Sequence, residues 1–311
     1  QAEDGIRDRS PSRGLGDVYK RQVAWDCGNG AAGDILPDLI SRLPGNHVSL
    51  NEDVDGTFPA HHPDPTVAEN LLQLQAVVTS EKLDMGVSFD GDGDRIGVVD
   101  GEARILWGDQ LLAILSRDVL AENPGSTIIA DVKSSQVLFN EISRLGGIPL
   151  MFKSGHSLIK CKMAETNSPL AGEMSGHIFF ADKYYGFDDA LYVAVRFLDA
   201  VAKSRQSVVS LRDSLPQMVN TPEVRFDCND DRKFQVVREV VATLRNSDAN
   251  FSDIDGARVS NEDGWWLLRA SNTQPVLVVR CEASNEAGLS RLKAAVTKAL
   301  APHGVAPPVD F

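Results

Sequence analysis

Three aspartates at alternate positions form the strongest chemical signal in this sequence. Asp90, Asp92 and Asp94 belong to the stretch DGDGDR, with a glycine between neighbouring aspartates and a short apolar run on either side. Glycine allows a tight loop to turn so that all three carboxylates aim at one point, and hard divalent cations prefer such oxygen ligands. Without a cation the three negative charges would repel one another. The loop therefore predicts a site for a divalent cation.

This loop has two other possible interpretations. An EF-hand needs glycine at position six and glutamate at position twelve of its loop, and counted from Asp90 these positions hold Arg95 and Gly101. The flanking runs also have the character of strands rather than helices, so a calcium-sensing protein is not indicated. A solvated Asp-Gly turn without any ligand is the second alternative.

A guanidinium follows the carboxylates directly. Arg95 would place a fixed positive charge beside a bound cation, and this pairing suits a phosphoryl group in transfer. A salt bridge from Arg95 to one of the aspartates is the simpler alternative.

A second polar stretch, RASNTQP, occurs between two strand-like runs. Its chemistry comes from Arg269, Ser271, Asn272 and Thr273. A turn at this point would present backbone N–H groups and hydroxyls around a bidentate guanidinium, which together could hold a phosphate that does not react. A polar hairpin chosen only for its turn residues is equally compatible with the stretch alone.

Three other stretches supply further candidates. Glu173 and Ser175 in GEMSGH could clamp neighbouring sugar hydroxyls; the stretch does not match the G-x-S-x-G nucleophile elbow. His156 in KSGHSLIK and Lys133 after TIIAD come where parallel strands end, and ligands usually bind at that edge of a sheet. A packed histidine and a surface lysine are the ordinary alternatives.

Strands and helices alternate along the first two thirds of the chain. We expect a helix over 109–121, a strand over 127–131, a helix over 135–144 and a strand over 148–152. Thr66 and Glu69 fit a capping box at the start of an earlier helix. This alternation predicts mostly parallel sheets with helices on both faces.

The order of elements changes near residue 217. Strands are expected near 257–260, 265–269 and 276–281, followed by a last helix that Ser284 could cap. The fold class is therefore α/β, with two consecutive α/β domains that have mixed or mostly parallel sheets, followed by a smaller α+β domain. The expected boundaries are 1–22 (a disordered or foreign segment), 23–104, 105–216 and 217–311.

Composition limits the classes of partner. The 311 residues include 44 acidic and 31 basic side chains, for a net charge of −13, and no basic tail is present, which argues against nucleic-acid binding. No apolar run is long enough for a membrane span. The four cysteines form no C-x-x-C pair, so a reducing, cytoplasmic setting is expected.

The motifs DGDGDR, GHSLIK, GEMSGH and RASNTQP, in this order, resemble the α-D-phosphohexomutase superfamily and specifically its bacterial phosphomannomutase/phosphoglucomutase group. The likeness runs from about Val23 to Phe311 and includes CGNGAAG, HHPDP and GFDDALY. Four motifs in a fixed order are far more specific than any one of them.

The resemblance implies an enzyme that interconverts hexose 6-phosphate and hexose 1-phosphate of mannose or glucose through a hexose 1,6-bisphosphate. It implies that Asp90, Asp92 and Asp94 bind Mg²⁺. The other implied site residues are Glu173 and Ser175 for the sugar; Arg269, Ser271, Asn272 and Thr273 for the phosphate; and Arg95, Lys133 and His156 lining the active site.

One expected motif is missing. Members of the family carry a phosphoserine in a TASHNP-like motif of a first domain, and no such motif occurs in these 311 residues. Residues 1–22 do not resemble the family either. We therefore expect a fragment that comprises the second, third and fourth domains and is inactive as a mutase by itself.

Three alternatives stay open on function. The enzyme could be a phosphoglucosamine mutase, although that group typically shows GEQSGH rather than GEMSGH, or a phosphoglucomutase proper. The chain could also bind Mg²⁺ and a phosphosugar without turnover. The full-length protein is expected to be a monomer.

Overall fold

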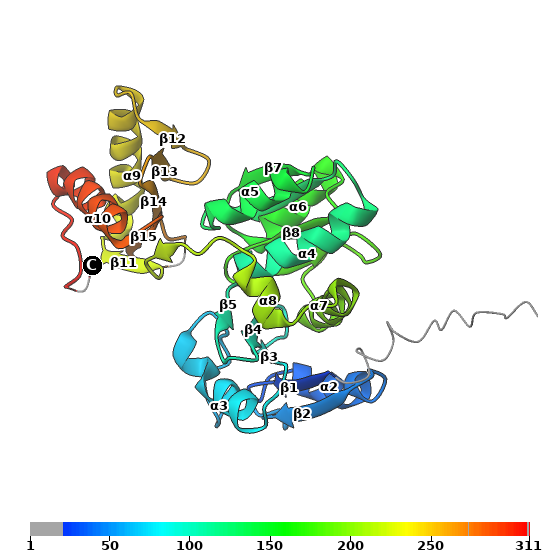
Figure 1. The fold of residues 1–311 in the computed structure, drawn as a ribbon. Coiled ribbons are helices and arrows are strands. Elements are labelled where there is room, and N and C mark those ends of the chain that lie inside the picture. Colours follow the sequence, from blue (N-terminus) through cyan, green and yellow to red (C-terminus); the bar gives the residue numbers. More distant parts are fainter. Residues whose placement is uncertain (1–20, 273, 310) are drawn as a thin grey trace, which may run out of the picture. The chain divides into compact units, whose positions relative to one another are not determined.

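A computed structural model describes residues 21–272, 274–309 and 311, which form two compact units (Figure 1). Unit 1 consists of residues 21–124 and 175–214, and unit 2 of residues 125–174 and 215–311. Most of the segment 1–22, which we expected to be foreign or disordered, lies outside the described residues. Gln22, within it, begins the first strand of unit 1.

Unit 1 is built on a mixed sheet with the strand order β2-β1-β3-β4-β5. The strands β2, β1 and β3 are parallel, whereas β3, β4 and β5 are antiparallel to their neighbours. The strands of unit 1 are β1 (Gln22–Asp26), β2 (Asn46–Leu50), β3 (Met85–Phe89), β4 (Ile96–Asp100), β5 (Ile105–Leu106) and β9 (Ile178–Phe180).

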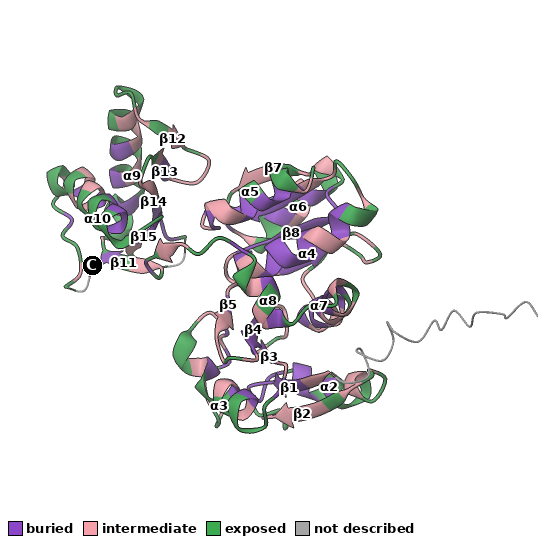
Figure 2. Cartoon of the chain, viewed as in Figure 1, coloured by how far each residue is buried: buried purple, intermediate pink, exposed green. Residues whose placement is uncertain are grey.

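Helices of unit 1 bury their apolar faces against the sheet and against one another. Leu74 and Val78 of one helix pack with Ala24 and Val99 of the strands. A second helix, α4, is drawn largely buried in Figure 2 and packs against α7. The helices are α2 (Ala32–Ile40), the 3-10 helix η2 (Ala68–Leu71), α3 (Leu72–Ser80), α4 (Gly108–Glu122), α7 (Ala190–Ser204) and α8 (Val208–Asp213).

Unit 2 begins with parallel strands. β6 (Thr127–Asp131) pairs with β7 (Ile148–Phe152) and with β8 (Leu170–Gly172). Helices α5 (Gln136–Arg144) and α6 (His156–Thr166) belong to this part. Because the strands are parallel, their carboxyl ends meet at one edge, and the loops that follow all three strands lie there.

The rest of unit 2 is an antiparallel sheet with the order β10-β15-β14-β13-β12, and β11 also pairs with β15. Side chains alternate between its faces: Trp266 and Leu268 join the core under α9 and α10, whereas Trp265 and Leu267 contact Val132 on the other face. The elements are β10 (Val219–Asn220), β11 (Val224–Asp227), α9 (Asp230–Arg245), β12 (Asn250–Ser252), β13 (Ala257–Asn261), β14 (Gly264–Ala270), β15 (Val276–Ala283), α10 (Glu286–Leu300) and the 3-10 helix η3 (Ala301–His303).

The α/β class predicted from the sequence is confirmed, and two predicted helix caps are wrong. Both the N–H and the hydroxyl of Thr66 bond to the carboxylate of Asp64, so this side chain closes a local turn, and α3 begins only at Leu72. At the last helix Asn285 rather than Ser284 accepts from the first turn, because its side chain reaches the N–H of Gly288 at 2.9 Å. No helix among the described residues has the length and apolarity that crossing a membrane requires.

Candidate metal and phosphate sites

The aspartate loop of unit 1 connects β3 to β4 in an antiparallel hairpin. Asp90 follows Phe89, the last residue of β3, and Phe89 pairs with Ile96 at the start of β4. Gly93 has a φ of +78°, which side-chain-bearing residues rarely adopt. The alternation of aspartate and glycine therefore has a conformational reason at this position.

Asp90 organises the loop around its own carboxylate. Its Oδ1 accepts the backbone N–H groups of Gly93, Asp94 and Arg95 at 3.0–3.1 Å. Its Oδ2 accepts Nε of Arg95 at 2.6 Å. The side chain is almost fully buried. The predicted salt bridge of Arg95 to an aspartate of the loop is therefore present, and Oδ2 retains lone-pair capacity for a further ligand.

The three carboxylates converge as a cation site requires. One oxygen from each of Asp90, Asp92 and Asp94 lies within 4.8 Å of the others. Burial raises the pKa of Asp94 to about 6; His177 opposes this rise, and the charges of Asp90 and Asp92 add to it. Crowded carboxylates whose ionisation is costly fit a divalent cation such as Mg²⁺, because the cation supplies the charge that is missing.

Asp94→Asn should stabilise the metal-free protein above pH 6 and remove its stabilisation by Mg²⁺. The pKa of Asp94 is about 6 in the folded state, against about 4 in an unfolded chain. Wild-type stability therefore falls as the pH rises from about 4 to 6. The asparagine removes this cost, which is on the order of 1 kcal/mol or about 2–4 °C after solvent screening. Thermal unfolding at pH 8, with and without Mg²⁺, measures both effects; an equal Mg²⁺ shift in both proteins would contradict the prediction.

Two neighbouring loops support the aspartate loop. Because β1 and β3 are parallel neighbours, the loop that follows Asp26 lies beside it, and the N–H of Ala31 bonds to the carbonyl of Gly91 at 2.9 Å. From the HHPDP segment, Asp64 accepts NH1 of Arg95 at 3.1 Å. These two motifs, CGNGAAG and HHPDP, therefore position the aspartate loop and its arginine, a role that their sequences alone did not indicate.

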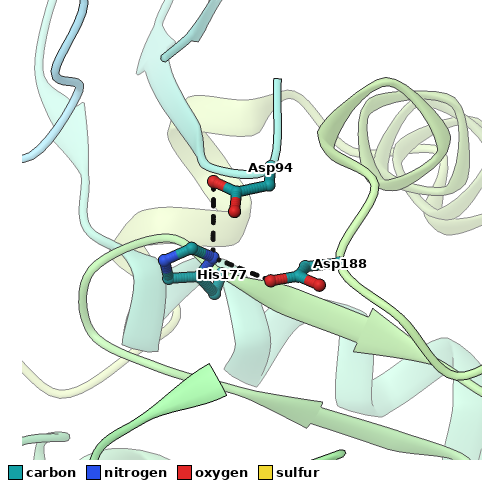
Figure 3. Close-up of side chains that lie close together, drawn as sticks. All are labelled: Asp94, His177 and Asp188. Carbon is teal, nitrogen blue, oxygen red and sulfur yellow. Dashed lines mark ion pairs between the residues drawn. The ribbon is translucent and has the colours of Figure 1, made fainter. Parts of the chain in front are cut away.

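A histidine and a further aspartate also lie against this loop (Figure 3). Nδ1 of His177 is 3.5 Å from Oδ1 of Asp94 and 3.1 Å from Oδ2 of Asp188. Neither residue was predicted from the sequence, although His177 belongs to the motif GEMSGH and Asp188 to GFDDALY. A histidine two positions after Ser175 was the available signal.

The predicted phosphate loop of unit 2 borders a pocket of about 280 Å³. Its lining is polar and carries two arginines; it consists of Ser154, Gly155, Glu223, Arg225, Arg269, Ser271, Asn272, Gln274 and Val278. An arginine, a hydroxyl and an amide around one opening are suitable partners for an anion with several oxygens. Thr273 lies outside the described residues.

Strand periodicity brings Arg269 to this pocket. It shares the face of β14 that carries Trp265 and Leu267, turned away from the core under α9 and α10. Nε of Arg269 donates to Oδ2 of Asp255 at 3.1 Å, and the same oxygen accepts the N–H of Ser154 at 3.2 Å. Asp255 therefore fixes the guanidinium next to the pocket, and the sequence analysis did not identify it.

The loop itself is a closed hairpin. The N–H of Ser271 bonds to the carbonyl of Val276 at 3.0 Å, and Oγ of Ser271 accepts the N–H of Gln274 at 3.2 Å. The buried ammonium of Lys233 donates to the carbonyl of Gln274 at 2.9 Å. The polar residues thus serve the turn, as the hairpin alternative predicts, and they also line the pocket.

Lys133 is a largely buried cation at the carboxyl edge of β6. Its Nζ lies 3.2 Å from Glu223 and 4.0 Å from Asp131. Burial alone would lower the pKa of Lys133, but Asp131, Glu223 and Glu173 together outweigh this effect and raise it. Lys133 is therefore protonated at neutral pH, which suits an anion-binding role and not a general base.

Glu173 and His156 also lie at this edge of the sheet, which was predicted for His156. Glu173 directly follows β8, is buried, and accepts the N–H of Gly155 at 2.7 Å. His156 begins α6 and is exposed. Asp131 connects these loops: its carboxylate accepts from Ser154 at 2.9 Å and from the N–H of Met174 at 3.2 Å. The sequence analysis did not single out Asp131, which ends the run TIIAD.

The predicted site residues thus fall into two groups. Unit 1 contains the three aspartates with Arg95, and also Ser175, which is half-buried. Unit 2 contains the residues at the carboxyl edge and the phosphate loop, namely Lys133, His156, Glu173, Arg269, Ser271 and Asn272.

Three family models match successive parts of the chain. They are the phosphoglucomutase/phosphomannomutase alpha/beta/alpha domain II over residues 13–103, alpha/beta/alpha domain III over 107–219, and the C-terminal domain over 223–299. The models follow one another in chain order and leave only short gaps.

Individual proteins agree with these matches. A phosphomannomutase/phosphoglucomutase of Pseudomonas putida is 47% identical over 291 residues, which cover 93% of this chain and 63% of that protein. The chain thus spans less than two thirds of the length of this curated relative. A crystal structure of a phosphoglucomutase/phosphomannomutase family protein from Burkholderia thailandensis shares 40% identity with a TM-score of 0.87 and covers 96% of this chain and 65% of that one.

A more distant structure shows the same fold. It is the Aspergillus fumigatus N-acetylphosphoglucosamine mutase in complex with GlcNAc-6P and magnesium, at 17% identity and a TM-score of 0.65, and it covers 92% of this chain and 68% of that one. From the three family models and the closely similar proteins, the chain belongs to the phosphoglucomutase/phosphomannomutase family.

Proposed function

We propose that this chain provides the metal-binding, sugar-binding and phosphate-binding parts of a mutase that interconverts hexose 6-phosphate and hexose 1-phosphate. The pocket lined by Arg269, Ser271 and Asn272 carries this proposal, because a predicted phosphate loop borders a polar, positively charged opening of the size of a small ligand. The names of relatives such as the Pseudomonas putida protein support mannose and glucose as the sugars.

The residues of the aspartate loop would bind the metal ion and the phosphoryl group in transfer. Asp90, Asp92 and Asp94 would hold Mg²⁺, which when bound neutralises charge on a phosphoryl group in transfer. Arg95 is fixed beside this loop by Asp90 and Asp64 and would contact the same phosphoryl oxygens. The magnesium in the Aspergillus fumigatus structure supports the choice of cation.

The residues of unit 2 would grip the substrate. Arg269, Ser271, Asn272 and Thr273 would hold the phosphate that does not react, and Lys133 would add a second cation at the strand edge. Glu173 and Ser175 are the residues that we propose for binding sugar hydroxyls in either orientation of the hexose. His156, exposed at the start of α6, would line the same edge. A hexose 1,6-bisphosphate would serve as the intermediate.

The domain boundaries proposed from the sequence are 23–104, 105–216 and 217–311. The limits of the three family models, near residues 103–107 and 219–223, support the two inner boundaries. The first model begins at residue 13, so the family likeness includes residues 13–22, which we had expected to be foreign to the family. A cytoplasmic location and a monomeric full-length protein remain part of the proposal.

Calorimetry on the 311-residue chain tests the function and the sugar together. Glucose 1-phosphate and mannose 1-phosphate should both release heat at one site per chain, and glucosamine 1-phosphate should bind at least tenfold more weakly. If the glucosamine compound binds best, the protein is a phosphoglucosamine mutase; if none of the three binds, the proposal fails.

A coupled mutase assay separates binding from turnover. We expect no turnover of glucose 1-phosphate by this chain with Mg²⁺ and a hexose bisphosphate, because none of its residues matches the phosphoserine motif. Turnover that survives further purification would mean that another serine of the chain accepts the phosphoryl group.

A further inference from the structure

We propose that His177, Asp188 and Asp94 form a second cation site in unit 1, selective for a borderline divalent metal ion such as Zn²⁺. The three side chains come from three segments of the chain: the aspartate loop, the residue before β9 and the loop before α7. One ligand atom from each lies within 4.8 Å of the others. Figure 3 shows the imidazole facing both carboxylates.

The donor spacing suits a small tetrahedral ion. Zn–N and Zn–O bonds of about 2.0–2.2 Å place neighbouring ligand atoms of a tetrahedron about 3.3–3.6 Å apart. In this site Nδ1 of His177 lies 3.1 Å from Asp188 and 3.5 Å from Asp94. Both distances from the histidine are therefore within about 0.2 Å of the spacing that a bound ion needs. The oxygens of Asp94 and Asp188 lie within 4.8 Å of each other.

The donor set decides the class of metal. Mg²⁺ and Ca²⁺ favour all-oxygen ligands, whereas an imidazole nitrogen favours Zn²⁺, Co²⁺ and related ions. The DGDGDR loop offers only carboxylates and fits the hard ions. The two groups therefore differ in chemistry although they meet at Asp94.

Backbone contacts hold the three donors in place before any ion binds. Arg95 and His177 form an isolated β-bridge, which attaches the histidine to the end of the aspartate loop. A second bridge joins Phe179 to Asp188, and the His177 ring stacks on Phe179 with an interplanar angle of 16°. The N–H of Ala190 bonds to the carbonyl of Gly93 at 3.0 Å. This pre-organisation reduces the entropy lost on binding an ion.

Burial leaves one side of the site accessible. The Asp188 side chain is 6% exposed and that of His177 is 15% exposed, whereas Asp94 is 28% exposed. An ion can therefore approach past Asp94 and be enclosed by the other two ligands. Because Asp94 is shared, occupation by Zn²⁺ should weaken Mg²⁺ binding at the DGDGDR loop.

Zinc titration by calorimetry tests this site, with Cys161→Ser as the parent so that the exposed thiol does not contribute. We expect one Zn²⁺ per chain and an affinity at least tenfold lower in His177→Ala. His62→Ala removes an exposed histidine of the same unit and should bind Zn²⁺ as the parent does. The Mg²⁺-dependent rise in melting temperature should persist in His177→Ala, which shows that the loop is folded.

Asp92→Asn distinguishes the two cation sites. It should abolish Mg²⁺ binding and leave Zn²⁺ binding intact, since Asp92 is not among the three zinc ligands. If Zn²⁺ instead follows Asp92 and ignores His177, the ion occupies the DGDGDR loop and the inference is wrong. A third outcome separates this inference from the proposed function. If neither the parent nor Asp92→Asn binds Mg²⁺ while Zn²⁺ binding still depends on His177, the proposed function loses its metal site and this inference stands.

Discussion

Arg258→Ala should lower the free energy of unfolding of unit 2 by about 3–5 kcal/mol. The guanidinium is 2% exposed, and its NH1 donates to the carbonyls of Val132 and Ser134 at 2.6 and 2.8 Å. It also lies over the Trp265 ring, 3.8 Å from the ring centroid. Alanine would remove these bonds and the stacking contact, leave two buried carbonyls without this donor, and open a cavity.

Urea titration followed by hydrogen exchange of β6 and β13 peptides measures this effect in unit 2 separately from unit 1. Arg245→Ala is the matched control, because Arg245 is an exposed arginine at the end of α9 that pairs with Asp253, and its loss should cost less than about 1 kcal/mol. Equal effects of the two substitutions would refute the role of Arg258.

Arg269→Ala should weaken binding of glucose 1-phosphate at least about 30-fold, corresponding to a loss of 2 kcal/mol or more. Asp255 fixes this guanidinium at the wall of the pocket, so the side chain reaches its ligand without further ordering. A planar fork can bind two phosphate oxygens at once, whereas an ammonium binds as a point charge. Arg269→Lys should therefore give an intermediate affinity.

Calorimetry with glucose 1-phosphate compares these variants, and melting temperatures show whether each is folded. Arg245→Ala serves again as a control, since it removes one positive charge from unit 2 away from the residues that line the pocket. Unchanged affinity in a folded Arg269→Ala protein would remove the phosphate loop from the proposed function.

Local patterns predicted the elements that carry the chemistry. The strand-turn-strand of the DGDGDR loop depends on residues within a few positions of one another: glycine supplies the turn and Asp90 binds its own loop. β6, α5 and β7 agree with the ranges expected from apolar periodicity to within a residue. Interactions between residues close in sequence determine such features, so they can be predicted from the sequence alone.

Side chains that act across long sequence distances were not predictable in this way. Asp255 accepts a hydrogen bond from Arg269 because the fold brings the two residues together. In the same way, Asp131 accepts from Ser154 and Met174 only in the folded sheet. His177 lies near Asp94 because a β-bridge joins His177 to Arg95, and no periodicity in the sequence predicts this bridge. A single sequence does not show which distant residue will donate a hydrogen bond to an aspartate in a loop. The wrong cap at Thr66 has a different, local origin, because Asp64, two residues earlier, accepts both the N–H and the hydroxyl of Thr66.

Unit 1 is made of two separate segments of the chain, so it can complete its folding only after the second segment has been synthesised. Residues 175–214 return to unit 1 after a segment of fifty residues that belongs to unit 2. During synthesis the aspartate loop therefore emerges long before Gly176, His177 and Ala190, whose backbones brace it. Closing such a long loop is slow compared with local hairpin formation. The metal loop should thus become rigid late in folding, after β6 to β8 have left the ribosome, and a nascent chain stopped near residue 124 would present its carboxylates without their support.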